Sequence, residues 1–167
     1  GIFETYKKRI PWLLLLMVSA TFTGQVIKSF GDALSVCTVL TLFIPMLMDT
    51  GGNAGGQASV TVIRGLSLGE IEYSDVFGII WKELRVALLC GGTLAAANFV
   101  KLSVALVVCL TLVITVIMAK LIGCTLPILA KKVGFDPAVM ASPFITTIVD
   151  ALSLIVYFQI ATHLLGL

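Results

Sequence analysis

Long apolar segments occupy most of this 167-residue sequence and constrain its fold more than any other feature. A helix that crosses a bilayer needs about 20 consecutive, mainly apolar residues. Five segments are long enough: residues 11–29, 33–63, 76–100, 102–122 and 138–165. Only 12% of the residues are charged, whereas soluble domains carry about 25%. The sequence therefore predicts an all-α integral membrane protein with five transmembrane helices.

Lysine and arginine residues lie mainly on one side of the predicted bundle. In membrane proteins, the loops that are rich in these residues stay in the cytoplasm. The N-terminus and the second and fourth connections each carry three of them, whereas the other side has only Lys28 and Lys101. The residues on the richer side are Lys7, Lys8, Arg9, Arg64, Lys82, Arg85, Lys120, Lys131 and Lys132. We therefore expect a cytoplasmic N-terminus and a C-terminus outside the cell membrane.

Composition disfavours two other classes of function. The net charge is +2, and no basic cluster with interleaved aromatic residues is present, so we expect no nucleic-acid partner. The four cysteines form no C-x-x-C pair, which disfavours a metal cluster. The partner that the apolar surface requires is the lipid bilayer.

An acidic residue, Asp150, lies near the middle of the last apolar segment. A charge at the bilayer centre costs about 2.5–3.5 kcal/mol on insertion scales, so such a residue usually faces a water-filled cavity or an ion path. Hydroxyl residues lie on or beside the same helical face: Ser142, Thr146, Thr147 and Ser153. Oxygen ligands suit a hard cation, and the lack of His and thiolate disfavours copper or zinc. The alternative is a buried hydrogen bond or ion pair between helices, but we expect no Lys or Arg in a span at this depth.

The second segment carries a polar stripe. Pro45, Asp49, Asn53, Gln57 and Thr61 recur every four residues and therefore share one slowly drifting helical face. The remaining faces carry the glycines, which let neighbouring backbones approach closely: Gly51, Gly52, Gly55 and Gly56. We expect the proline and glycines to loosen this helix and free carbonyl groups. The alternative is a helix that uses its small residues and interhelical hydrogen bonds for packing alone.

One carboxylate binds a divalent cation poorly, and five helices are few to enclose an aqueous path. A two-fold homodimer, the commonest oligomeric arrangement, would bring two Asp150 side chains together. Magnesium dehydrates reluctantly and usually keeps several waters. A fairly wide polar pathway suits it better than a tight cage.

Three motifs resemble the membrane domain of the MgtE family of magnesium channels. Residues 45–57 read Pro-Met-Leu-Met-Asp-Thr-Gly-Gly-Asn-Ala-Gly-Gly-Gln, and residues 63–70 read Ile-Arg-Gly-Leu-Ser-Leu-Gly-Glu. Residues 136–150 read Asp-Pro-Ala-Val-Met-Ala-Ser-Pro-Phe-Ile-Thr-Thr-Ile-Val-Asp. The resemblance implies a homodimeric, Mg²⁺-selective channel for magnesium uptake, with a pore lined by the second and fifth helices of both protomers.

The resemblance also implies roles for individual residues. Asp150 is the acid of the central metal site, and the Thr146 region supplies a neighbouring oxygen. Asn53 lines the cytoplasmic side of the pore. Asp49 lines the pore or pairs with a polar group at the subunit contact. The remaining expected pore-lining residues are Gln57, Ser142, Thr147 and Ser153.

Bacterial members of this family carry cytoplasmic N-terminal and CBS domains that sense Mg²⁺, whereas here only residues 1–10 precede the first span. We expect residues 1–167 to form a single ion-conducting domain without these regulators. The chain is then either a piece of a longer protein, with a cytoplasmic CBS domain as its partner, or a naturally minimal member.

Three rival hypotheses remain open. The chain could be a secondary transporter that exchanges Mg²⁺ against Na⁺ or H⁺. Asp49-Thr-Gly is similar to an aspartic-protease motif, and Asp49 with Asp150 could form an intramembrane acid pair. We nevertheless expect no enzyme, because that motif belongs to β-frameworks. The last rival is a packing subunit of a larger complex, in which Asp150 would not affect ion flux.

Overall fold

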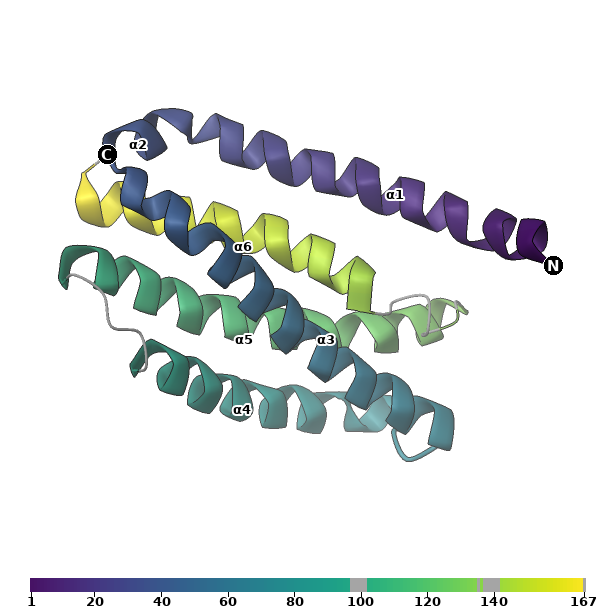
Figure 1. Cartoon of the computed structure of the whole chain (residues 1–167). Coiled ribbons are helices and arrows are strands. Elements are labelled where there is room, and N and C mark those ends of the chain that lie inside the picture. Colours follow the sequence, from purple (N-terminus) through teal and green to yellow (C-terminus); the bar gives the residue numbers. More distant parts are fainter. Residues whose placement is uncertain (97–101, 135, 137–141, 167) are drawn as a thin grey trace.

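The computed structural model describes residues 1–96, 102–134, 136 and 142–166, and every element in these ranges is a helix (Figure 1). The all-α prediction is confirmed for this part of the chain. The α-helices are α1 (Ile2–Ser29), α2 (Gly31–Val36), α3 (Ile44–Leu68), α4 (Val76–Ala96), α5 (Leu102–Val133) and α6 (Ser142–Leu165). Two short 3₁₀ helices, η1 (Thr38–Phe43) and η2 (Tyr73–Asp75), precede α3 and α4.

The long helices form a bundle in which α3 crosses its neighbours. Helices α1, α6, α5 and α4 lie side by side in that order, and α3 packs diagonally across α5 and α6 (Figure 1). Successive long helices run in opposite directions, so the N-terminus and the C-terminus lie at opposite ends of the bundle.

Three helices of the described chain are long and apolar enough to cross a membrane: α1, α5 from Val104 onward, and α6 from Pro143 onward. Helices α3 and α4 fall outside this group because they carry polar residues within their length. In α3 these include Asp49, Asn53 and Gln57, and in α4 they are Lys82, Glu83 and Arg85. That α3 and α4 also cross the membrane, with the predicted orientation, stays a prediction.

The second predicted segment is not one helix. The chain breaks after α2, passes through η1 and begins α3 at Ile44, so Pro45 lies in the first turn of α3. A proline needs no N–H there. The expectation that Pro45 loosens the helix and frees carbonyls is therefore wrong: α3 is continuous across its glycines. Residues 97–100, at the end of the third predicted segment, and residues 138–141, at the start of the fifth, lie outside the described residues.

The fourth predicted segment is longer than expected, which corrects the position of Lys120. Helix α5 continues past residue 122 to Val133, because Gly123 packs against α3 and does not end the helix. Lys120 is therefore in the helix interior and only 6% exposed, not in a cytoplasmic connection. Lys131 and Lys132 lie in the last turn of α5. The prediction that Lys120 belongs to the fourth connection is therefore wrong, and two of its three expected positive charges remain, Lys131 and Lys132.

The α3–α5 crossing brings two backbones into direct contact. A Cβ atom added at Gly123 would collide with the carbonyl oxygen of Gly55, and one added at Gly55 would lie 3.0 Å from the carbonyl oxygen of Ala119. Gly123 also lies against Ala58, whose Cβ would be 3.1 Å from an added Cβ. Small residues on both helices are what permits so close an approach.

A buried hydrogen bond holds the region before α3 onto α6. The Tyr157 hydroxyl donates to the carbonyl oxygen of Leu40 in η1 at 2.9 Å. Tyr157, Phe158, Leu40 and Leu47 are all fully buried and belong to one apolar cluster. This cluster fixes where α3 begins relative to α6.

We predict that Gly123→Ala destabilises the protein by about 1–3 kcal/mol, the usual cost of overpacking, because a backbone carbonyl cannot move aside. The matched control is Gly24→Ala on α1, where an added Cβ has nothing within 4 Å. Thermal unfolding in detergent measures both. A Gly123→Ala variant as stable as Gly24→Ala would contradict the close α3–α5 contact.

Candidate functional site

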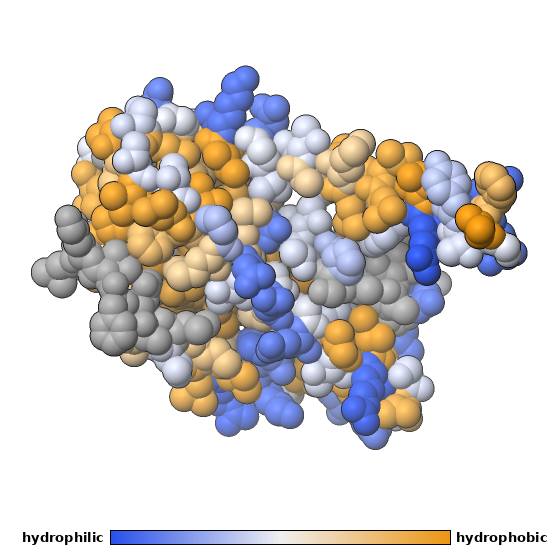
Figure 2. All heavy atoms as spheres, viewed as in Figure 1, coloured by the Kyte–Doolittle hydropathy of each residue, from blue (hydrophilic) through white to orange (hydrophobic). Residues whose placement is uncertain are grey.

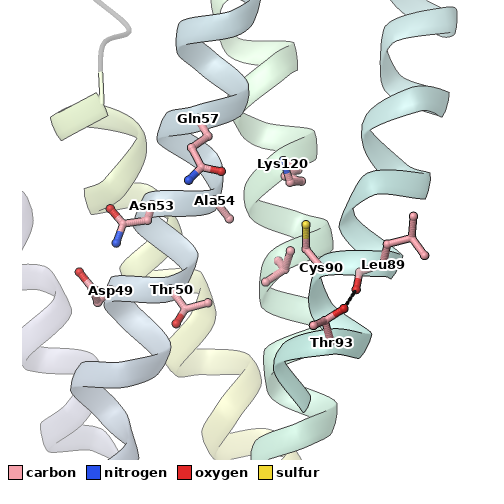
Figure 3. Close-up of a pocket in the computed structure, with 10 residues that line it drawn as sticks. Asp49, Thr50, Asn53, Ala54, Gln57, Leu89, Cys90, Thr93 and Lys120 are labelled. Carbon is pink, nitrogen blue, oxygen red and sulfur yellow. Dashed lines mark hydrogen bonds between the residues drawn. The ribbon is translucent and has the colours of Figure 1, made fainter. Parts of the chain in front are cut away.

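The polar stripe predicted for the second segment lies on an exposed face of α3. Asp49, Asn53 and Gln57 are exposed, whereas the intervening Gly52 and Ala54 are buried. We call Asp49, Asn53 and Gln57 the α3 polar stripe; their side chains follow one side of the helix (Figure 3). Figure 2 shows hydrophilic surface along the middle of this face of the molecule, over α3, between hydrophobic surfaces. A polar band therefore separates apolar surfaces on this face of the molecule.

At two glycines of α3, the face of α6 that carries the predicted metal site packs directly against the α3 backbone. A Cβ atom added at Gly52 would lie 2.7 Å from Cγ2 and 3.2 Å from Oγ1 of Thr146. One added at Gly51 would lie 2.9 Å from Cγ1 of Val149 and 3.2 Å from Oγ of Ser153. The structure thus brings Thr146 directly against α3, beside the helix turn that carries Asn53.

Asp150 projects from the next turn of the same α6 face. Its side chain is half-buried, and it lies close enough to Asp49 for the two carboxylates to interact electrostatically. Its Oδ1 atom is buried and has no hydrogen-bond partner among the described residues. Buried polar atoms are nearly always paired, and an unpaired one is costly. This oxygen is therefore free to accept a hydrogen bond or to bind a cation.

Two further buried oxygens near this position have no hydrogen-bond partner in the part of the chain that the structure describes. They are Oγ1 of Thr115 on α5 and Oγ of Ser153 on α6. Gly51 lies between them, because a Cβ added there would be 2.7 Å from Thr115 Cγ2 as well as 3.2 Å from Ser153 Oγ. Ser153 is fully buried inside the helical bundle, so it lies deeper than the exposed stripe.

The remaining residues expected at the site lie at the start of α6. The Thr147 hydroxyl donates to the carbonyl oxygen of Pro143 at 2.9 Å, so it is engaged within its own helix. Ser142 opens α6, but its side chain lies outside the described residues. Within the described chain, no group of three or more His, Cys, Asp or Glu side chains is arranged to hold a metal ion. The described residues thus bring two carboxylates, those of Asp49 and Asp150, near each other but form no carboxylate cage.

A cavity of about 470 Å³ opens beside the stripe, between α3, α4 and α5 (Figure 3). Its polar lining comes from Asp49, Thr50, Asn53, Gln57, Cys90, Thr93 and Lys120. At this position the Lys120 ammonium donates to Oε2 of Glu83 on α4 at 3.1 Å. This ion pair was not predicted from the sequence. The signal was present, because Glu83 and Lys120 are opposite charges within two adjacent apolar segments.

Comparison with known proteins gives a consistent result. Residues 44–160 match the model of the MgtE family, described as a divalent cation transporter. The chain is 36% identical over 162 residues to a protein named magnesium transporter MgtE from Bacillus subtilis, covering 93% of this chain and 36% of that protein. It is 32% identical over 171 residues to the protein of that name from Thermus thermophilus, covering 99% of this chain and 38% of that protein.

The chain is also 31% identical over 162 residues to the protein of the same name from Enterococcus faecalis, covering 93% of this chain and 36% of that protein. The chain thus spans little more than a third of the length of the curated relatives it matches. The suspected family is confirmed, as is the membrane location, since α1, α5 and α6 are apolar enough to span a bilayer. This chain is a membrane protein that belongs to the MgtE family of divalent cation transporters.

Proposed function

We propose that this chain conducts Mg²⁺ across the cell membrane, along a polar pathway lined by α3 and α6. The observation that carries the proposal is the exposed α3 polar stripe beside Asp150, whose buried Oδ1 atom has no partner among the described residues. The names of the relatives, all magnesium transporters, support Mg²⁺ as the cargo. A transport role also agrees with our expectation that the chain is not an enzyme.

The chemistry of the stripe suits a hydrated ion. Mg²⁺ gives up its waters reluctantly, so it usually reaches a protein through one or two carboxylates and several retained waters. The amide oxygens of Asn53 and Gln57 can accept hydrogen bonds from those waters. Asp150 supplies negative charge at the turn where α6 meets α3, and the Thr146 region provides a further oxygen. Passage then needs no fully dehydrated cage.

We further propose that two protomers form the pathway as a homodimer. An amide and carboxylate stripe facing lipid is unfavourable, because hydrocarbon cannot satisfy its hydrogen bonds. A second copy related by two-fold symmetry would cover the stripe and supply a second Asp150, which matches the charge of one divalent ion. A cytoplasmic CBS domain, which the resemblance implies as a partner, would regulate this pathway.

We predict that Asp150→Asn lowers Mg²⁺ flux into proteoliposomes by at least about tenfold, because the charge that stabilises the ion is lost. The control is Asp32→Asn, an exposed acid in the first turn of α2. Flux unchanged by Asp150→Asn would assign Asp150 to helix packing and contradict the proposal.

The same preparation separates a channel from an exchanger. A channel carries Mg²⁺ down its own gradient when Na⁺ and proton gradients are both absent. Flux that requires one of those gradients would favour exchange of Mg²⁺ against Na⁺ or H⁺ instead.

We also predict that Gly52→Ala reduces Mg²⁺ flux several-fold, because the added methyl group would push the Thr146 side chain from its place against α3. Gly92→Ala on α4, where an added Cβ meets nothing within 4 Å, is the control. Flux per folded protein, with folding followed by thermal unfolding, separates this effect from the stability cost of about 1–3 kcal/mol. Normal flux through Gly52→Ala would show that the Thr146 position is not critical.

A further inference from the structure

A buried ion pair connects α4 to α5 within the helical bundle. The Lys120 ammonium lies 3.1 Å from Oε2 of Glu83, with side-chain exposures of 7% and 13%. Ion pairs this buried are expensive to desolvate and are often no more stabilising than apolar residues of the same volume. Helix association alone therefore does not explain the pair.

The pair lies at the edge of the proposed ion pathway. Lys120 lines the cavity of about 470 Å³ together with Asp49, Asn53 and Gln57 of α3. Among the described residues that line this cavity, Asp49 and Lys120 are the charged ones. Figure 3 shows Lys120 on α5, beside the part of α3 that carries Gln57. A fixed positive charge thus lies beside a stripe that we propose to be in contact with divalent cations.

We propose that Glu83 is a positioning residue that neutralises Lys120, so that the balance of this pair sets the affinity of the neighbouring stripe for divalent cations. The inference rests on the proposed Mg²⁺ function and deepens it. An unpaired ammonium repels a divalent ion twice as strongly as a monovalent ion at the same distance, and a low-dielectric surrounding strengthens the effect. The glycine contact between α3 and α5 holds the pair beside the stripe, because Gly55, Ala119 and Gly123 meet within one helical turn of Lys120.

Two opposite single substitutions distinguish this role from simple packing. Glu83→Gln leaves the ammonium unpaired, and we expect the half-saturating Mg²⁺ concentration of flux to rise about tenfold. Lys120→Met leaves the carboxylate unpaired, and we expect that concentration to fall. The double variant Glu83→Gln/Lys120→Met restores the wild-type value, because the net local charge is again zero. Lys82→Gln, which removes an exposed charge one residue away on α4, should leave it unchanged.

A purely structural pair predicts a different pattern. Both single variants would then lower the maximal flux and the unfolding temperature, with no opposite changes in the half-saturating Mg²⁺ concentration. Shifts in the same direction, or no shift in either variant, would overturn the proposal. One buried charge without its partner can prevent folding, so Glu83→Asp serves as a milder variant. It keeps both charges but shortens the acid, which separates the pair, so we expect a smaller rise in the half-saturating Mg²⁺ concentration, whereas the double variant keeps the wild-type value. Glu83→Asp equal to the wild type would overturn the proposal.

A binding measurement keeps this inference separate from the transport proposal. The Mg²⁺ dissociation constant of the full chain in detergent, from calorimetry, should show the same opposite shifts as the flux. If wild-type protein binds Mg²⁺ with these shifts but carries no flux, the transport proposal fails and the electrostatic role of the pair stands. If wild-type protein carries flux while the dissociation constants of the two single variants equal that of the wild type, the pair has no such role. Absence of Mg²⁺ binding by the wild-type protein would overturn the inference as well.

Discussion

The backbones of α3 and α5 touch, and this contact determines which face of α3 stays exposed. Gly55 and Gly123 approach so closely that no side chain fits between them, and Gly51 and Gly52 allow α6 to approach α3 from another side. With two faces of α3 occupied by glycine contacts, the face with Asp49, Asn53 and Gln57 is left exposed. The small residues thus place the polar stripe, although they contribute no ligand chemistry of their own.

Two acidic side chains of the bundle, Glu83 and Asp150, differ in whether they have a charged partner. Glu83 has a cationic partner at 3.1 Å, whereas Oδ1 of Asp150 is buried without a partner among the described residues. The first arrangement cancels a charge, and the second leaves a charge available for an ion. Because Lys120 also lines the cavity beside the stripe, both arrangements bear on the same proposed pathway. The electrostatic character of that pathway then depends on three helices, since Glu83, Lys120 and Asp150 come from α4, α5 and α6.

Local spacing was enough to predict some features, while others required knowledge of tertiary contacts. A period of four residues places Asp49, Asn53 and Gln57 on one side of any helix, and the structure agrees. Sequence also predicted the helical class and the family. It did not locate the break between α2 and α3, although Pro45, which lies in the first turn of α3, was a signal for a helix that begins there. Nor could it show that α5 continues through Gly123 and that Lys120 reaches Glu83, because both facts depend on how α3, α4 and α5 pack together.

An α3 polar stripe that lines an ion pathway must face water inside the membrane, and chemical labelling can detect that water. In a variant without the four native cysteines, Asn53→Cys and the buried Ala58→Cys would be treated in proteoliposomes with a water-soluble cationic thiol reagent. We expect rapid modification at position 53, slowed by Mg²⁺, and little modification at position 58. Modification at position 53 by a lipid-soluble reagent only, or no protection by Mg²⁺, would show that the stripe does not line a water-filled ion pathway.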